Sequence, residues 1–112
     1  MNRLVIHKDL TQKNLFRVLG GSVYKNHYWD IARTKEEVVA YLTQFKPDLI
    51  SIGPLPGMSI EQVATYLRTL YIAAKIKIPA VTCVDKDQIQ SVRVVMNGGE
   101  TPYNAGHVDA LA

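Results

Sequence analysis

The stretch that decides the fold is Lys46-Pro47-Asp48-Leu49-Ile50-Ser51-Ile52-Gly53-Pro54-Leu55-Pro56-Gly57-Met58. Pro47 cannot continue a helix, because its ring clashes with the preceding turn and it has no amide hydrogen. The apolar run Leu49–Ile52 has the length of a short buried strand. The loop that follows, residues 53–58, is rich in proline and glycine, which favour turns. This stretch therefore predicts a helix that ends before Pro47, a buried strand over Leu49–Ile52 and a turn over residues 53–58.

Upstream, residues 4–21 predict a strand followed by a helix. Leu4-Val5-Ile6 is a short apolar run, typical of a buried strand. Thr11 can cap a helix, because its hydroxyl can accept a hydrogen bond from a free amide of the first turn. Gly20-Gly21 would end that helix, since glycine adopts the left-handed conformation without steric cost. The apolar face of this helix is made of Leu15, Val18 and Leu19.

A second strand and a second helix are expected between residues 28 and 45. Tyr28-Trp29-Asp30-Ile31 alternates and is aromatic, which favours a strand that is more exposed than the first. Thr34 and Glu37 have the spacing of a capping box, in which the threonine oxygen accepts an amide and the glutamate reaches back. The helix that begins there carries an apolar face made of Val38, Tyr41, Leu42 and Phe45.

Downstream, two helices flank a fourth strand. Ser59 begins a helix with Gln62 in the capping-box position. Ile78–Val84 is rich in β-branched residues and predicts the strand. Asp87 is expected to cap a last helix, which ends at Asn97-Gly98-Gly99. The helix from Ser59 shows the clearest helical period, through Ile60, Val63, Ala64, Leu67, Leu70, Tyr71 and Ala74. The last helix carries Ile89, Val92, Val95 and Met96.

The resulting order β-α-β-α-β-α-β-α predicts an α/β fold. Parallel strands need crossover connections, and helices of this length supply them. Right-handed crossovers give an open, doubly wound parallel sheet with helices on both faces. The expected strand order is 2-1-3-4, as in flavodoxin-like folds. The chain is expected to be one domain over residues 1–112, in which residues 100–112 form an irregular tail or a short fifth strand near Thr101–Tyr103.

Composition excludes several classes of protein. The chain has 112 residues, of which 47% are hydrophobic and 21% charged, as in an ordinary soluble domain. The net charge of +3 comes from scattered cations without interleaved aromatic residues, so nucleic acid is not an expected partner. Neither a membrane span nor a signal peptide is recognisable. Cys83, the one cysteine, excludes a disulfide framework and predicts a small buried hydrophobe in a cytoplasmic protein.

Residues 46–58 resemble the centre of a response-regulator receiver domain, where that family reads Pro-Asp-Leu-Ile-x-x-Asp-x-x-Met-Pro-Gly-Met. The resemblance extends over residues 3–98. In receivers the aspartate after the third strand accepts a phosphoryl group, and Gly53 occupies its position here. An acidic pair after the first strand holds Mg²⁺ with that aspartate, since a hard dication needs oxygen ligands. This chain has His7-Lys8-Asp9 there, and Val84-Asp85 where the fourth strand of a receiver ends in serine or threonine.

The resemblance therefore implies a pseudo-receiver that cannot be phosphorylated and acts through protein contacts, with no enzymatic activity and no cofactor. Trp29-Asp30-Ile31-Ala32-Arg33-Thr34-Lys35-Glu36-Glu37 is in addition similar to the strand-to-helix junction of the cyclic-phosphate-processing receiver-like family. The acidic and histidine motifs of that family are replaced by Lys8-Asp9, Gly53-Pro54-Leu55 and Val84-Asp85. A diverged phosphodiesterase that uses His7 and Asp9 is a further hypothesis.

A second class of function is a binder of small anions, such as a nucleotide or a cyclic nucleotide. Ligands of such sheets bind at the carboxyl ends of the strands, where helix N-termini converge and favour anions. The competing interpretation is that the residues there are solvated loop residues. The candidate ligand-binding residues are His7, Lys8, Asp9, Gly53, Asp85 and Lys86. His7, His27 and His107 are too dispersed for a recognisable metal motif, so no metal is expected.

Aromatic residues also suggest a surface for a protein partner or a homodimer. Tyr24, Tyr28 and Trp29 crowd one segment, and aromatic residues dominate interface hot spots. Val94, on the last helix beside other valines, is a second candidate contact. The alternative is that the aromatic residues cover the edge of the sheet and pack on the first helix.

Overall fold

The computed structural model describes residues 2–11 and 28–97, with Tyr28 and Trp29 described by their backbone alone. Its elements are β1 (Asn2–Ile6), β2 (Tyr28–Ala32), α2 (Lys35–Gln44), β3 (Leu49–Ile52), α3 (Ile60–Ala74), β4 (Ala80–Cys83), a 3₁₀ turn (Lys86–Gln88) and α4 (Ile89–Met96). The helix predicted from Thr11 and the tail over residues 100–112 lie outside the described residues.

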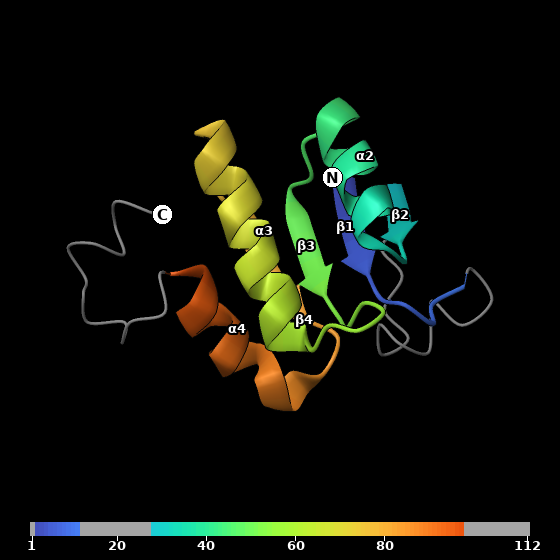
Figure 1. The fold of residues 1–112 in the computed structure, drawn as a ribbon, viewed down its shortest axis with the longest axis vertical. Coiled ribbons are helices and arrows are strands. Elements are labelled where there is room, and N and C mark those ends of the chain that lie inside the picture. Colours follow the sequence, from blue (N-terminus) through green and yellow to red (C-terminus); the bar gives the residue numbers. More distant parts are fainter. Residues whose placement is uncertain (1, 12–27, 98–112) are drawn as a thin grey trace.

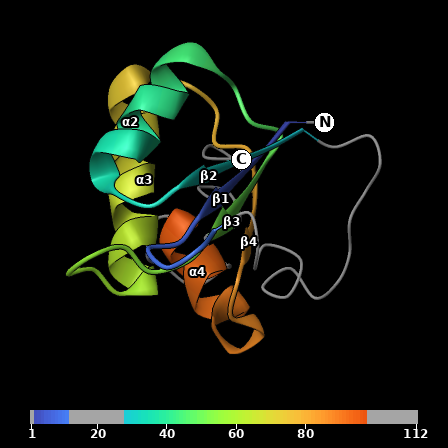
Figure 2. The ribbon, with the colours of Figure 1, turned by 90° about the vertical axis from the view of Figure 1, so that its right-hand side faces the viewer.

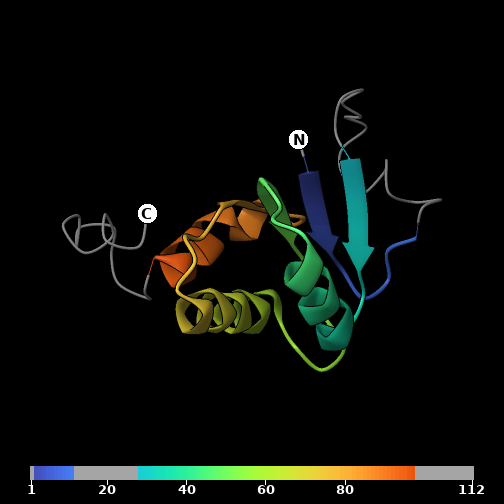
Figure 3. The same ribbon diagram turned by 90° about the horizontal axis from the view of Figure 1, so that it is seen from above.

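The four strands form one all-parallel sheet in the order β2-β1-β3-β4, so the predicted α/β class and strand order are confirmed (Figure 1). β1 lies between β2 and β3, with Leu4 opposite both Asp30 and Ile50. Among the described elements, α2 and α3 cover one face, and α4 packs against α3 and β4 (Figures 2 and 3). The sequence predicts helices on both faces, and the helix predicted from Thr11 lies outside the described residues.

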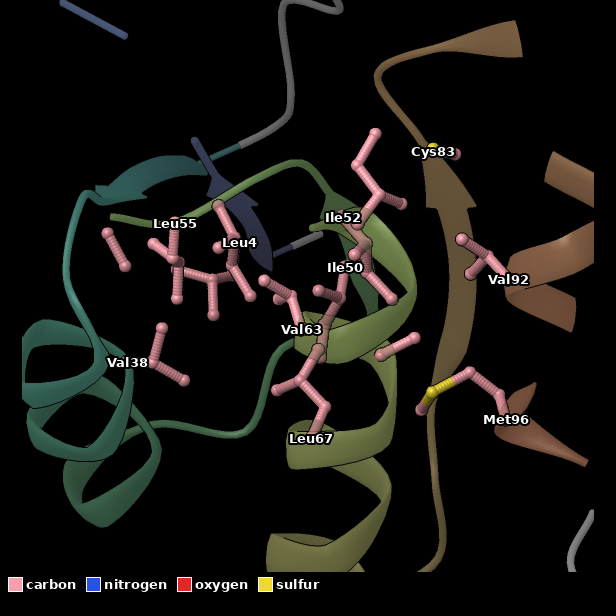
Figure 4. Packing of buried hydrophobic residues seen from close by; sticks show 14 of the residues in the cluster. Leu4, Val38, Ile50, Ile52, Leu55, Val63, Leu67, Cys83, Val92 and Met96 are labelled. Carbon is pink, nitrogen blue, oxygen red and sulfur yellow. The ribbon is translucent and has the colours of Figure 1, made fainter. Parts of the chain in front are cut away.

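The main core lies between the sheet and these three helices. Because side chains alternate along a strand, Leu4 and Ile6 of β1 point to the same face. They join Ile50 and Ile52 of β3, and the helices add Val63, Leu67, Val92 and others (Figure 4). Of the predicted face of α3, Ile60, Val63, Ala64, Leu67 and Tyr71 are buried, Leu70 is half-buried and Ala74 is exposed. The opposite face of the sheet carries a smaller cluster around Val5 and Leu10.

Local capping bonds begin α2 and α3 where the sequence predicts them. Ser59 Oγ accepts the amide of Gln62 at 3.2 Å, and Gln62 Oε1 accepts the amide of Ser59 at 2.8 Å, which completes a capping box. Thr34 Oγ1 accepts the amide of Glu37 at 3.1 Å. Glu37 reaches back one residue further than the motif predicts, and its Oε1 accepts the amide of Arg33 at 2.7 Å.

Three local predictions are wrong. Asp85, not Asp87, is the cap after β4, because its Oδ1 accepts the amide of Asp87 at 3.0 Å and begins the 3₁₀ turn before α4. The fourth strand spans Ala80–Cys83, shorter than the predicted run over residues 78–84. Phe45 is the C-cap of α2 with extended backbone and is 49% exposed, so it leaves the apolar face predicted for that helix.

Candidate functional site

The loops that follow β1, β3 and β4 meet at the carboxyl edge of the sheet, at the lower end of the arrows in Figure 1. The amide of Lys8 donates to the carbonyl of Pro54 at 2.8 Å, which joins the loop after β1 to the loop after β3. The amide of Val84 donates to the carbonyl of Ile52 at 3.0 Å, which joins β3 to the end of β4. These bonds hold the predicted residues around Gly53 at one edge.

Gly53 is buried in the middle of this edge, and no larger side chain fits there. A Cβ built on Gly53 would meet the carbonyl oxygen of Ile6, and would lie 2.9 Å from His7 Cδ2 and 2.9 Å from Val84 Cγ2. The first of these neighbours is backbone and belongs to the buried strand β1, so it cannot turn aside. The position that resembles a receiver's acceptor is therefore closed to any residue other than glycine in this backbone arrangement.

His7 borders Gly53 and is largely neutral near pH 7. Burial lowers the pKa of the His7 imidazole below its usual 6.5, Asp9 partly opposes that shift, and Lys8 adds to it. His7 Nδ1 accepts the amide of Asp9 at 3.1 Å, which leaves the proton of the neutral ring on Nε2. Lys8 and Asp9 are themselves exposed.

A cavity of about 1000 Å³ opens beside this edge. Of the six predicted ligand-binding residues, it brings together His7, Asp85 and Lys86. Lys8, Asp9 and Gly53 are not among the described residues that line it. We call it the polar cavity, because its described lining also includes Arg3, Ser51, Ser59, Thr82 and Gln88.

Sequence reasoning missed Arg3 and Ser51, which form the floor of the polar cavity. Ser51 is fully buried in β3, and Arg3 Nε and Nη2 lie 3.3 Å and 3.1 Å from its hydroxyl oxygen. The two side chains meet because Arg3 pairs with Leu49 in the parallel register, which places Ser51 diagonally across from it on the same face. The signal in the sequence was a serine inside an apolar strand, since buried polar groups need a partner.

Both carboxylate oxygens of Asp85 accept hydrogen bonds within its own turn. One carboxylate oxygen accepts the amide of Asp87, and the other lies 3.0 Å from Gln88 Nε2. A carboxylate with both oxygens bonded in this way stabilises the turn into α4 and is a weak candidate for acid–base chemistry. Lys86, the next residue, is exposed and projects from the same turn. The described lining of the polar cavity thus combines two cationic side chains, Arg3 and Lys86, with one capped acid, Asp85.

A second hollow, of about 380 Å³, lies at the opposite end of the sheet, between the C-terminal ends of α2 and α3 at the top of Figure 1. Its described lining is mainly apolar and includes Val39, Leu42, Phe45, Leu70, Tyr71, Ile76, Lys46 and Lys77. We call it the apolar groove. The side chains of Val39, Phe45 and Ile76 are 41%, 49% and 44% exposed. The sequence does not predict this groove, because its pattern places Phe45 on the apolar face of the helix with Val38, Tyr41 and Leu42.

The aromatic interface predicted from the sequence is only partly within the described residues. Tyr24 lies outside them, and the backbone of Tyr28 and Trp29 forms β2, at one edge of the described sheet. Val94 is half-buried on α4. These residues are therefore not brought together into a surface that the structure describes.

Cys83 is buried in the main core, and burial raises the pKa of its thiol above the usual value. Such a thiol is a poor nucleophile and metal ligand, because both roles need the thiolate. Among residues 2–11 and 28–97, no group of three His, Cys, Asp or Glu side chains is arranged to hold a metal ion. None of the described helices is long and apolar enough to cross a membrane.

Comparison with known proteins adds no relative. No family model, no curated protein and no solved structure matches this chain. Any function must therefore be argued from the chain's own residues.

Proposed function

We propose that this chain is a cytoplasmic, phosphorylation-incompetent pseudo-receiver, which docks to a protein partner without a phosphoryl switch. The observation that carries this proposal is the closure around Gly53 by the carbonyl of Ile6 and the side chains of His7 and Val84. Aspartyl phosphorylation needs a carboxylate at this position with a metal-binding acidic pair beside it. Neither the acceptor nor the room for it is available.

The position of the exposed large apolar side chains supports a role in protein contact. Exposed apolar residues that are scattered singly need no explanation, but a cluster marks an interaction surface. Val39, Phe45 and Ile76 are each more than two-fifths exposed and line one groove. A surface of this kind, on a scaffold whose switch position is closed, supports constitutive docking.

The test is to incubate the protein with acetyl phosphate and Mg²⁺, and to measure its intact mass and its backbone amide spectrum. We expect no phosphoryl adduct and no change in the spectrum. In parallel, the tagged chain is cross-linked in host cell lysate with and without acetyl phosphate. We expect the same partner in both samples. A stoichiometric, acid-stable and base-labile adduct would disprove the proposal, and so would a partner that binds only after phosphorylation.

A second candidate function, binding of a small anion, is favoured by the polar cavity. Its volume of about 1000 Å³ suits a nucleotide-sized ligand. Arg3 and Lys86 supply positive charge, and Ser59, which caps α3, also lines it. The phosphodiesterase hypothesis needs a positioned acid or base, for which the sequence offers His7 and Asp9. Of these two residues, His7 lines the polar cavity and Asp9 does not.

A thermal-shift screen with mononucleotides and cyclic nucleotides, with and without Mg²⁺, tests this second candidate. A ligand at 100 times its dissociation constant adds about 2.7 kcal/mol to the free energy of unfolding. The shift should be lost in Lys86→Ala and kept in Arg93→Ala, since Arg93 lies in the last turn of α4 and outside the cavity lining. A flat screen would leave the docking function as the one to pursue.

A further inference from the structure

We infer that the apolar groove receives an amphipathic helix of a protein partner, with apolar residues on one face and carboxylates at its flanks. This inference rests on the proposed docking function and names the surface and the chemistry of the partner. The groove lies between the C-terminal ends of α2 and α3, at the end of the sheet remote from Gly53. It is therefore independent of the polar cavity.

The apolar part of the argument is the size and lining of the groove. A volume of about 380 Å³ is too small for a domain and suits a few inserted side chains. Val39 comes from α2, Phe45 ends α2, and Ile76 follows α3, so the exposed apolar side chains line both sides. The ring of Tyr41, in α2, packs against the ring of Phe45, with centroids 5.1 Å apart. This contact restricts the Phe45 ring at the rim of the groove.

The shape of the groove favours a helix over an extended strand. An extended peptide binds mainly by pairing its backbone with the amides of a sheet edge. Here the loops that enter β3 and β4 present Pro47 and Pro79 to the groove, and proline has no amide hydrogen to donate. A helix needs no such pairing, because its apolar residues at i, i+3, i+4 and i+7 carry the contact.

The charged residues around the groove indicate which residues should flank the apolar face of the partner helix. Lys46 and Lys77 line it, Lys75 is the C-cap of α3 beside it, and all three are exposed. None of the described lining residues is acidic. The acidic residues of the two helices, Glu36, Glu37 and Glu61, lie in their first turns, at the other end.

Two other sources of negative charge do not cancel these cations. The C-terminal ends of two helices carry about half a negative charge each, against three whole positive charges. Part of that helix charge is already satisfied, because the amides of Phe45 and Ile76 donate to the carbonyls of Tyr41 and Tyr71. Asp48, the acid next to Pro47, lies outside the described lining, and its carboxylate accepts the amide of Asn2 at 2.8 Å while keeping its charge. Three cations against one carboxylate and two half-charged helix ends leave an excess of about one positive charge. The rim therefore attracts carboxylates.

The test selects binders from a random peptide library displayed on phage, using the whole chain as bait and Ile76→Ser for counter-selection. We expect enriched peptides with a helical apolar period and flanking Asp or Glu. Amide shifts on titration with the best peptide should cluster on the ends of α2 and α3. Enrichment of basic peptides, no enrichment over blank beads, or shifts at another surface would overturn the inference.

Matched variants separate the groove from general surface effects. Ile76→Ser should weaken the selected peptide about tenfold or more, whereas Ile72→Ser, equally exposed but outside the lining, should not. Lys77→Glu should weaken binding in a salt-dependent manner, whereas Lys35→Glu, which makes the same charge change at the other end of α2, should not. Equal effects within either pair would contradict the inference.

Two results distinguish this inference from the docking function itself. If the partner found by cross-linking binds Ile76→Ser and Lys77→Glu normally, docking stands and the groove is not its surface. If the chain self-associates in sedimentation experiments, and Ile76→Ser alone abolishes that association, then the occupant is a second copy and the proposed partner helix is rejected.

Discussion

The two ends of the parallel sheet differ in the side chains that line their hollows. At the carboxyl end, the carbonyl of Ile6 and the side chains of His7 and Val84 crowd Gly53, and the polar cavity opens beside it. Hydrogen bonds join the loops after β1 and β3 there. At the opposite end, the last turns of α2 and α3 leave an apolar groove with Phe45 and Ile76 at its rim. Ligands of open α/β sheets bind at the carboxyl end. In this chain Gly53, at the carboxyl end, is closely surrounded, and the exposed apolar side chains of the groove lie at the other end.

The difference teaches that the residue at a position and the space around that position are separate properties of a site. Gly53 lacks a functional group, and the carbonyl of Ile6 and the side chains of His7 and Val84 leave no space for a larger residue there in this backbone arrangement. The polar cavity beside it contains cations and hydroxyls, so a binding role can be tested separately.

Among the variants that test this difference between the two ends of the sheet, Gly53→Ala should change the free energy of unfolding most. The added methyl meets the carbonyl of Ile6 and the side chains of His7 and Val84, so the free energy of unfolding should fall by about 3 kcal/mol. Urea unfolding followed by far-UV circular dichroism measures this change. Gly57→Ala is the control: Gly57 has a φ of 72° but open space around it, so only backbone strain of about 1 kcal/mol is expected. Equal losses in both variants would show that Gly53 is not closely surrounded.

Ser59→Ala should have the next largest effect. It removes the hydroxyl that caps α3 at the carboxyl end, and it should destabilise the chain by about 1 kcal/mol in the same urea assay. Ser91→Ala is the matched control, since Ser91 is exposed inside α4, where alanine is the better helix former. A loss as large in Ser91→Ala would mean that the assay reports something other than the cap.

A smaller effect is expected at the groove, where loss of an apolar side chain should affect binding more than folding. Ile76→Ser and Ile72→Ser remove equal groups that are 44% and 46% exposed, and each should cost about 0.5 kcal/mol of stability. Chemical unfolding of both variants measures this cost. If Ile76→Ser were destabilising by several kcal/mol, the groove would be part of the core and its role as a docking surface would be excluded.

The smallest effect is expected from His7, whose side chain is partly solvated. Its pKa is lower in the folded chain than the usual 6.5 of an unfolded one, so the unfolded state binds more protons between these two values. The stabilising contribution is therefore complete above about pH 6.5 and is lost as the pH falls through the lower, folded pKa. Urea midpoints of wild type and His7→Gln across this range isolate the effect from the other histidines. A wild-type stability that rises on acidification relative to the variant would contradict the burial of His7.

The sequence by itself determined the order of elements and the topology of the sheet. Ser59 with Gln62 and Thr34 with Glu37 marked the beginnings of helices, because a cap bond spans three residues of one segment. The apolar runs at Leu4–Ile6 and Leu49–Ile52 marked central strands, and the handedness of crossovers then limited the strand order. These features depend on neighbours along the chain, so they could be predicted from it.

Only the tertiary structure decided what each edge of the sheet can do. Whether Gly53 has room depends on its clearance from Ile6, the last residue of β1, and from Val84, the residue after β4. The bond from Arg3 to Ser51 depends on the register between β1 and β3. Phe45, expected inside, is exposed because α2 ends one residue before it and the backbone turns to an extended conformation. The clearance of Gly53 and the Arg3–Ser51 contact are distances between segments far apart in the chain, and no local pattern of residues encodes such a distance.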